Sequence, residues 1–302
     1  MTIKSSTADL SIETFNNACQ ESIARWTIFE FVSLLTLILL SFYSYSHNHY
    51  QYLIQIFFVG SIIYRPMLSY GFGWLGLAAI FTYVVANQWH PVANHKILTT
   101  YWLWVLAFMH LASNEQLKHK ILVTNARFLV IFTMLGACIQ KLLSPSYIDG
   151  SFFEMTLLTE TYFKFILETF GITPELSHLA KSTIRAIQTP SIKLTVDAVK
   201  LPVTPLYSGL AMAVTVWNLG IQFVLEALCL FKAKRVQICF HLLMLFFIHT
   251  TYIVAPFIGF GWLICILCYA FSAHIFPKIS LAYLLSIVVL GVYESPWRDL
   301  IS

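Results

Sequence analysis

The chain of 302 residues is far more apolar than a soluble protein, because 58% of its residues are hydrophobic and only 11% are charged, against about 25% in an average soluble domain. Its formal net charge of +4 comes from scattered basic residues rather than one basic patch, so nucleic acid is not an expected partner. Several apolar stretches reach the ~20 residues that cross a bilayer. We therefore expect a multi-pass integral membrane protein whose first partner is the lipid bilayer.

The N-terminal segment, residues 1–25, is polar. Its acids Asp9, Glu13 and Glu21 are not typical of a cleavable signal peptide. We expect this segment to lie in the cytoplasm and to be followed by a single transmembrane domain, residues 26–302.

Hydropathy predicts an all-α fold, a polytopic transmembrane helix bundle of about nine spans. In chain order these are residues 26–45, 52–64, 71–86, 98–112, 121–143, 206–231, 236–255, 257–276 and 279–293. Basic residues in the short loops, including Lys232, Lys234 and Arg235, favour a cytoplasmic N-terminus.

This topology leaves one long section, residues 144–205, on the outer (periplasmic or lumenal) side as an extramembrane helical insert. Within it, residues 152–170 combine an aromatic face with Glu154, Glu160 and Lys164. The pattern predicts an amphipathic helix that lies in the outer interface or packs over the bundle.

A single lysine ends the fifth predicted span. An uncharged run from Phe128 to Gln140 leads to Lys141, and the Ser144-Pro145 break follows closely. A charge in the middle of a bilayer costs a few kcal/mol, and less near the interface. Lys141 is therefore either an anchor that reaches the headgroups or a functional group.

Two other polar positions are open to two interpretations each. Asn48 and His49 lie in a predicted outer turn, where imidazoles can exchange protons near neutral pH, or where Asn48 simply supplies turn geometry. Glu226 is either an interfacial acid that pairs with Lys232 or Arg235, or a functional carboxylate inside the sixth span.

The seventh predicted span carries two histidines on one side. His241 and His249 are eight residues apart, which places them within ~80° of each other around a helix. They either line a polar interior or each form one interhelical hydrogen bond. The Cys265 and Cys268 spacing occurs in mid-span and is typical of packing. No metal site is expected, because no zinc-type histidine and carboxylate spacing is present.

Taken in order, several short motifs resemble those of the vitamin K-dependent carboxylase-like membrane domain, also called the horizontally transferred transmembrane (HTTM) domain. They cover most of residues 20–280. The motifs are Asn48-His49-Tyr50, Gly136 to Leu142 with the lysine, Tyr147-Ile-Asp149-Gly150, Glu226, Phe240-His241 and Phe257 to Gly261. A Gln-Lys-Leu before a proline is also similar, more weakly, to DoxX-like membrane proteins.

The resemblance implies proton or redox chemistry on a quinone-like lipid such as a vitamin K-like hydroquinone. Lys141 would be the base, which requires a neutral amine, and removal of the amine from water favours that form. His49, Glu226 and His241 are the other predicted catalytic residues. Asn48, Tyr147, Asp149 and His249 are expected to contact the quinone.

A second function remains open at this point. The chain could instead be a non-enzymatic membrane subunit that binds lipid or assembles with a partner complex. The aromatic helix predicted over residues 152–170 would then be its docking surface. The position of Lys141 distinguishes the enzyme from the non-enzymatic subunit. A catalytic base needs an enclosed site, whereas a lysine that only anchors a helix reaches the lipid headgroups.

Overall fold

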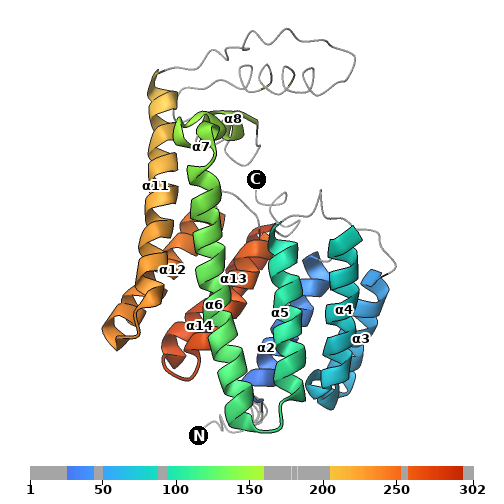
Figure 1. Cartoon of the computed structure of the whole chain (residues 1–302). Coiled ribbons are helices and arrows are strands. Elements are labelled where there is room, and N and C mark those ends of the chain that lie inside the picture. Colours follow the sequence, from blue (N-terminus) through green and yellow to red (C-terminus); the bar gives the residue numbers. More distant parts are fainter. Residues whose placement is uncertain are drawn as a thin grey trace, which may run out of the picture. The chain divides into compact units, whose positions relative to one another are not determined.

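The computed structural model describes residues 26–43, 50–87, 94–159, 178, 182, 205–252 and 258–294. These residues form helices, and no strand occurs among them. The predicted all-α fold is therefore confirmed for this part of the chain (Figure 1).

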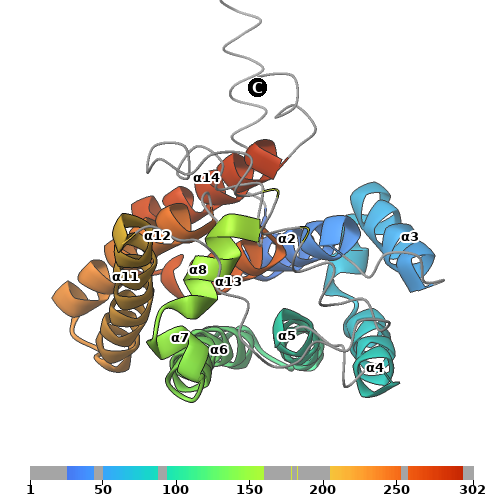
Figure 2. The ribbon, with the colours of Figure 1, turned by 90° about the horizontal axis from the view of Figure 1, so that it is seen from above.

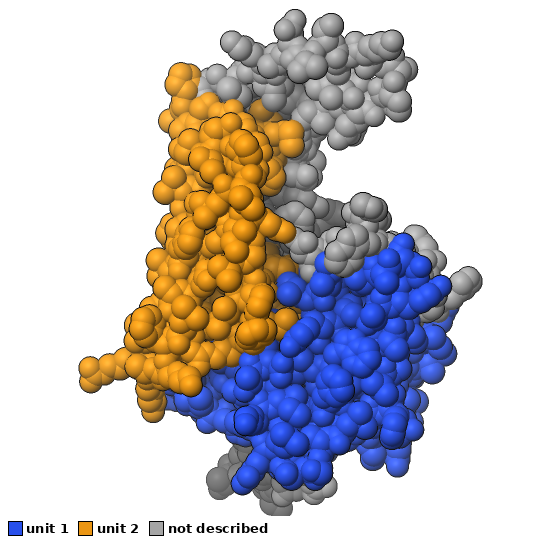
Figure 3. All heavy atoms as spheres, viewed as in Figure 1, with its two compact units in different colours: residues 1–126, 266–280 blue, residues 127–265, 281–302 orange. Residues whose placement is uncertain are grey.

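The chain divides into two compact units, which Figure 3 colours separately. The first comprises residues 1–126 and 266–280. Its complete helices are listed here in chain order: α2 (Ile28–Tyr43), α3 (Tyr50–Ile63), η1 (Arg65–Ser69), α4 (Gly71–Asn87) and α5 (Asn94–Leu111). Within this unit α2 packs on α3, and α4 lies beside α5 (Figures 1 and 2).

The second unit comprises residues 127–265 and 281–302. It contains α7 (Pro145–Ile148), α8 (Ser151–Thr159), α11 (Pro205–Leu230) and α12 (Lys234–Tyr252). Three further helices contribute residues to both units: α6 (Glu115–Leu142), α13 (Ile258–Ser272) and α14 (Pro277–Glu294). Within the second unit α11 packs against α8 and α12.

Each of the nine predicted spans falls on one of these helices, but the helices do not all qualify as spans. Only α6, with 28 residues, and α11, with 26, are both long and apolar enough to cross a membrane among the described residues. Five others are shorter apolar helices. In α5 and α12 the first turns are polar, with Asn94-His95-Lys96 and Lys234-Arg235. The structure thus supports two spans by length and composition, where the sequence predicted about nine.

Local sequence explains where α6 begins and ends. Asn114 caps its start, because the side-chain oxygen of Asn114 accepts the backbone N–H of Leu117 at 2.7 Å. The helix ends at Leu142, just before Ser144-Pro145, since the residue before a proline avoids helical backbone. Pro145 then opens α7 at a position where no N–H is needed.

A glycine makes the tight link between α7 and α8. Gly150 has a φ of +82°, a left-handed conformation that other residues adopt only with strain. Directly before it, Asp149 accepts the backbone N–H of Ser151 at 2.9 Å and so caps the start of α8. The helical start of the predicted 144–205 insert is therefore present as α7 and α8, and most of residues 160–204 lie outside the described residues.

Two fully buried tryptophans mark the core of the first unit. The indole N–H of Trp102 donates to the Thr36 hydroxyl at 3.0 Å, and that of Trp74 donates to the Leu68 carbonyl at 2.7 Å. Both rings thus satisfy their single polar atom, which would otherwise cost free energy in an apolar core.

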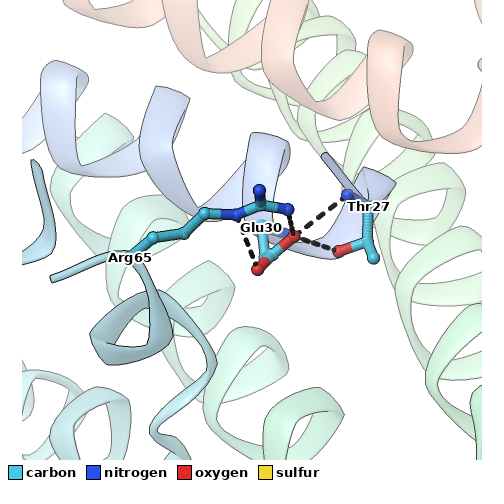
Figure 4. Close-up of polar contacts among 3 residues, drawn as sticks. All are labelled: Thr27, Glu30 and Arg65. Atoms are coloured by element: carbon cyan, nitrogen blue, oxygen red, sulfur yellow. Dashed lines mark hydrogen bonds and ion pairs between the residues drawn. The ribbon is translucent and has the colours of Figure 1, made fainter. Parts of the chain in front are cut away.

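A salt bridge fixes the start of α2 to η1 in the same unit (Figure 4). The guanidinium of Arg65 donates to both carboxylate oxygens of Glu30, at 3.1 and 2.7 Å. Glu30 also accepts the backbone N–H and hydroxyl of Thr27, and the Thr27 hydroxyl accepts the N–H of Glu30. This reciprocal pattern is a capping box, so one carboxylate both caps α2 and binds the arginine.

Replacing Glu30 with glutamine should therefore lower the free energy of unfolding by about 1–2 kcal/mol, because a helix cap and a half-buried bidentate ion pair are weakened together. Chemical unfolding in detergent measures the loss. The control is Glu115→Gln, whose carboxylate pairs with Lys118 at 2.9 Å but is 71% exposed, and should cost less than about 0.5 kcal/mol. Equal losses in the two variants would contradict the double role of Glu30.

Candidate functional site

Lys141 sits near the end of α6 and is held by three side chains of the second unit. Its Nζ donates to the amide oxygen of Gln222 at 2.6 Å and also to the amide oxygen of Asn218. The same nitrogen lies 5.2 Å from the centre of the Tyr147 ring, a cation–π distance. The Lys141 side chain is half-buried. These four residues are called the lysine cluster below.

The helix α11 presents both amides because of their spacing. Asn218 and Gln222 are four residues apart, which puts them on one face of the helix. Gln222 is only 6% exposed, in a helix whose other buried residues are mostly apolar. A buried amide of this kind needs a partner, and the lysine supplies it.

Tyr147 joins the cluster from the short helix α7. Its hydroxyl donates to the amide oxygen of Asn218 at 3.0 Å, so that oxygen accepts from both Tyr147 and Lys141. The tyrosine is 5% exposed, and this burial raises its pKa well above the ordinary value. Tyr147 therefore acts as a neutral donor at physiological pH.

The cluster holds the amine without an opposite charge. Both oxygens that accept from Lys141 belong to neutral amides, and no carboxylate bonds to it among the described residues. A protonated lysine has three N–H donors, of which two are used here, so one remains for another acceptor. A neutral lysine donating the same two bonds keeps its lone pair for a proton. The arrangement can thus take up or release a proton, or bind an oxygen of a ligand.

The other residues predicted for the site lie elsewhere or do something different. Asp149 caps α8 and is exposed, and its hydrogen bonds with Ser151 lower its pKa below the ordinary value. It forms no hydrogen bond with Lys141. Asn48 and His49 lie outside the described residues.

Glu226 continues the polar face of α11. It lies four residues after Gln222 and is half-buried. Within the described chain it forms no ion pair, so the pairing with Lys232 or Arg235, one of the two interpretations that the sequence left open, is not found. It also makes no hydrogen bond with Lys141. It remains a carboxylate one helical turn from the cluster.

The two histidines of α12 bridge to α14 within the second unit. Nδ1 of His241 lies 2.9 Å from the Tyr283 hydroxyl, and Nε2 of His249 lies 3.0 Å from the Ser286 hydroxyl. Each histidine therefore makes an interhelical hydrogen bond, one of the two interpretations that the sequence left open. Neither bonds to Lys141, and a catalytic role for either stays a prediction.

Asn218 and Gln222 were not predicted from the sequence as partners of Lys141. The signal was present, because Asn218 and Gln222 are polar residues spaced by one turn in an otherwise apolar helix. Such a pair predicts a polar contact on the facing helix. The sequence does not reveal which residue faces them, since that depends on how α6 and α11 pair.

In the part of the chain that the structure describes, the fold is helical, two helices are long and apolar enough to cross a membrane, and the lysine cluster lies in the second unit. Comparison with protein-family models, curated proteins and solved structures finds no match to this chain. The resemblance to the carboxylase-like membrane domain thus stays a prediction.

Proposed function

We propose that this chain is a multi-pass integral membrane protein whose lysine cluster binds a quinone-like lipid and exchanges a proton with it through Lys141. The observation that carries the proposal is the binding of the Lys141 amine by two neutral amide oxygens instead of a carboxylate. An ion pair would fix the proton on the lysine, whereas neutral acceptors leave it free to move. The ring oxygens of a quinone are acceptors, and those of a quinol are weak acids.

The surroundings of the cluster also suit a lipid-soluble ligand. Cys138 is buried one turn before Lys141, and the Tyr147 ring lies in tilted contact with Phe152 and in edge-on contact with Phe153, at ring-centre distances of 5.5 and 5.4 Å. Aromatic and apolar side chains of this kind pack well against a flat ring. The order of the sequence motifs, from the lysine motif to Glu226 and His241, supports the same ligand class.

The non-enzymatic subunit is the second candidate, and the apolar surface of α11 favours it. Val216, Trp217, Phe223 and Val224 are all large exposed hydrophobic residues on this helix. In the proposed membrane setting these side chains face lipid or a partner helix. The proposed docking helix is described only as α8, because residues 160–170 lie outside the described residues.

The proposed topology has about nine spans, a cytoplasmic N-terminus and α7 on the outer side. It predicts that the two ends of α6 lie on opposite faces of the membrane. Labelling of an introduced cysteine with a membrane-impermeant reagent measures this, using Ser113→Cys before the helix and Ser146→Cys after it, with Cys19 and the exposed Cys239 replaced by serine and the four buried cysteines kept. Labelling of both positions from the same side would contradict the topology.

Binding of a short-tailed benzoquinone tests the proposed function. Replacing Lys141 with alanine should weaken binding to the detergent-purified protein at least tenfold, because the amine is the cluster's only cationic donor. The matched control is Lys232→Ala, which removes an exposed lysine of the same unit and should change the dissociation constant less than twofold. Unchanged binding in Lys141→Ala would refute the proposal and leave the subunit function.

A further inference from the structure

A pair of histidines in the first unit forms a cluster that the lysine site does not use. His119 lies in the second turn of α6, and His274 lies in the turn that joins α13 to α14. Their ring centres are 4.4 Å apart and their planes meet at 66°. Residues far apart in the sequence thus place two imidazoles in direct contact.

Neither histidine of this pair forms a hydrogen bond or an ion pair within the described residues. His119 is half-buried and His274 is exposed, so the pair is accessible from the surface. The other histidines with partners here, His110, His241 and His249, each bond to a hydroxyl. The pair therefore differs from the histidines that serve packing.

The spacing of the rings matches two ligands of one metal ion. Two imidazoles bound to an ion at about 2.1 Å have ring centres about 4.5 Å apart when the bonds meet at a right angle, and about 5 Å apart at the tetrahedral angle. The observed 4.4 Å corresponds to the right angle. Right angles are typical of the tetragonal or octahedral coordination of Ni²⁺ and Cu²⁺, and imidazole is a ligand that both ions favour.

Nearby charges leave the site compatible with a cation. Lys118, the neighbour of His119, donates to the Glu115 carboxylate at 2.9 Å, so its charge is paired. Lys120 and Lys278 are exposed, where water screens their charge.

We propose that His119 and His274 bind a divalent transition-metal ion of the Ni²⁺ or Cu²⁺ type as a two-imidazole chelate. Water completes the coordination. The ion ties the first turns of α6 to the turn between α13 and α14, so it stabilises the folded protein. The site is independent of Lys141 and of any quinone.

Calorimetric titration of the full-length protein with Ni²⁺ tests the site. His119→Asn and His274→Asn should each weaken the tightest Ni²⁺ binding at least tenfold, and the double variant should lose no more than either single one, because a chelate needs both rings. The control is His178→Asn, which removes an exposed histidine and should alter the affinity less than twofold. Thermal unfolding without metal confirms that the variants fold.

The same protein samples give a second readout. Saturating Ni²⁺ should raise the Tm of the wild-type protein and of His178→Asn, and should leave the Tm of both paired-histidine variants unchanged. Single variants that keep wild-type Ni²⁺ affinity, or losses that simply add in the double variant, would overturn the chelate and leave only independent surface histidines.

Discussion

Replacing both amide partners of Lys141 with leucine should lower the free energy of unfolding by about 3 kcal/mol, the largest stability effect expected in this protein. In Asn218→Leu/Gln222→Leu the lysine loses both oxygens that accept from it. An amine in apolar surroundings then has no hydrogen-bond acceptor, and such a group is costly. Unfolding of the purified protein in mixed micelles measures the change.

A third substitution provides the control for this prediction. Adding Lys141→Met removes the stranded amine and keeps an unbranched side chain of similar length, so it should recover at least half of the lost free energy. The same Lys141→Met change in the wild-type background should be destabilising, because it leaves Gln222 buried without its partner. A triple variant no more stable than the double one would show that the three residues do not act together.

Replacing Arg127 with alanine is the second large change and should cost about 2–3 kcal/mol. Nε of Arg127 donates to the Cys229 carbonyl at 3.1 Å, and a terminal nitrogen donates to the Phe231 carbonyl at 3.1 Å. Cys229 lies in the last turn of α11 and Phe231 directly follows the helix, so neither carbonyl has a partner further along α11. The positive charge also suits the negative end of the helix dipole.

Arg127→Lys separates the contribution of the positive charge from that of the hydrogen bonds to the two carbonyls. A lysine keeps the charge but cannot donate in two directions from a planar group, so it should restore less than half of the loss. Hydrogen exchange of the last turn of α11 gives the local readout and should speed up in both variants. If exchange there stays at the wild-type rate in Arg127→Ala, the capping role is wrong.

Helices were predictable from this sequence because apolar runs and their breaks are local signals. The α6 helix shows this well, since an Asn114 cap starts it and the Ser144-Pro145 break follows its end. The number of spans is only partly supported, because among the described residues two helices are long and apolar enough to cross a membrane and five apolar helices are shorter. Whether a helix crosses a bilayer depends on its uninterrupted length as well as on its average composition.

The site was only partly predictable. Lys141 stood out because a charge beside an apolar run is costly, and Tyr147 was named with it on the strength of the motif. Their contacts with Asn218 and Gln222 depend on how α6 faces α11 across more than seventy residues of sequence. Likewise, the hydrogen bonds of His241 and His249 to α14 depend on how α12 packs against α14. The spacing of residues within α12 alone does not predict that packing.

Photoaffinity labelling tests most directly whether a quinone-like lipid binds at the lysine cluster. A short-tailed azidoquinone is bound to the purified protein, activated by light and located by peptide mass spectrometry. We expect labels on the ends of α6 and α7 near Lys141 and Tyr147 and on α11 near Asn218, all removed by excess unlabelled quinone and absent in Lys141→Ala. Labels confined to the exposed apolar faces, unchanged in Lys141→Ala, would contradict it.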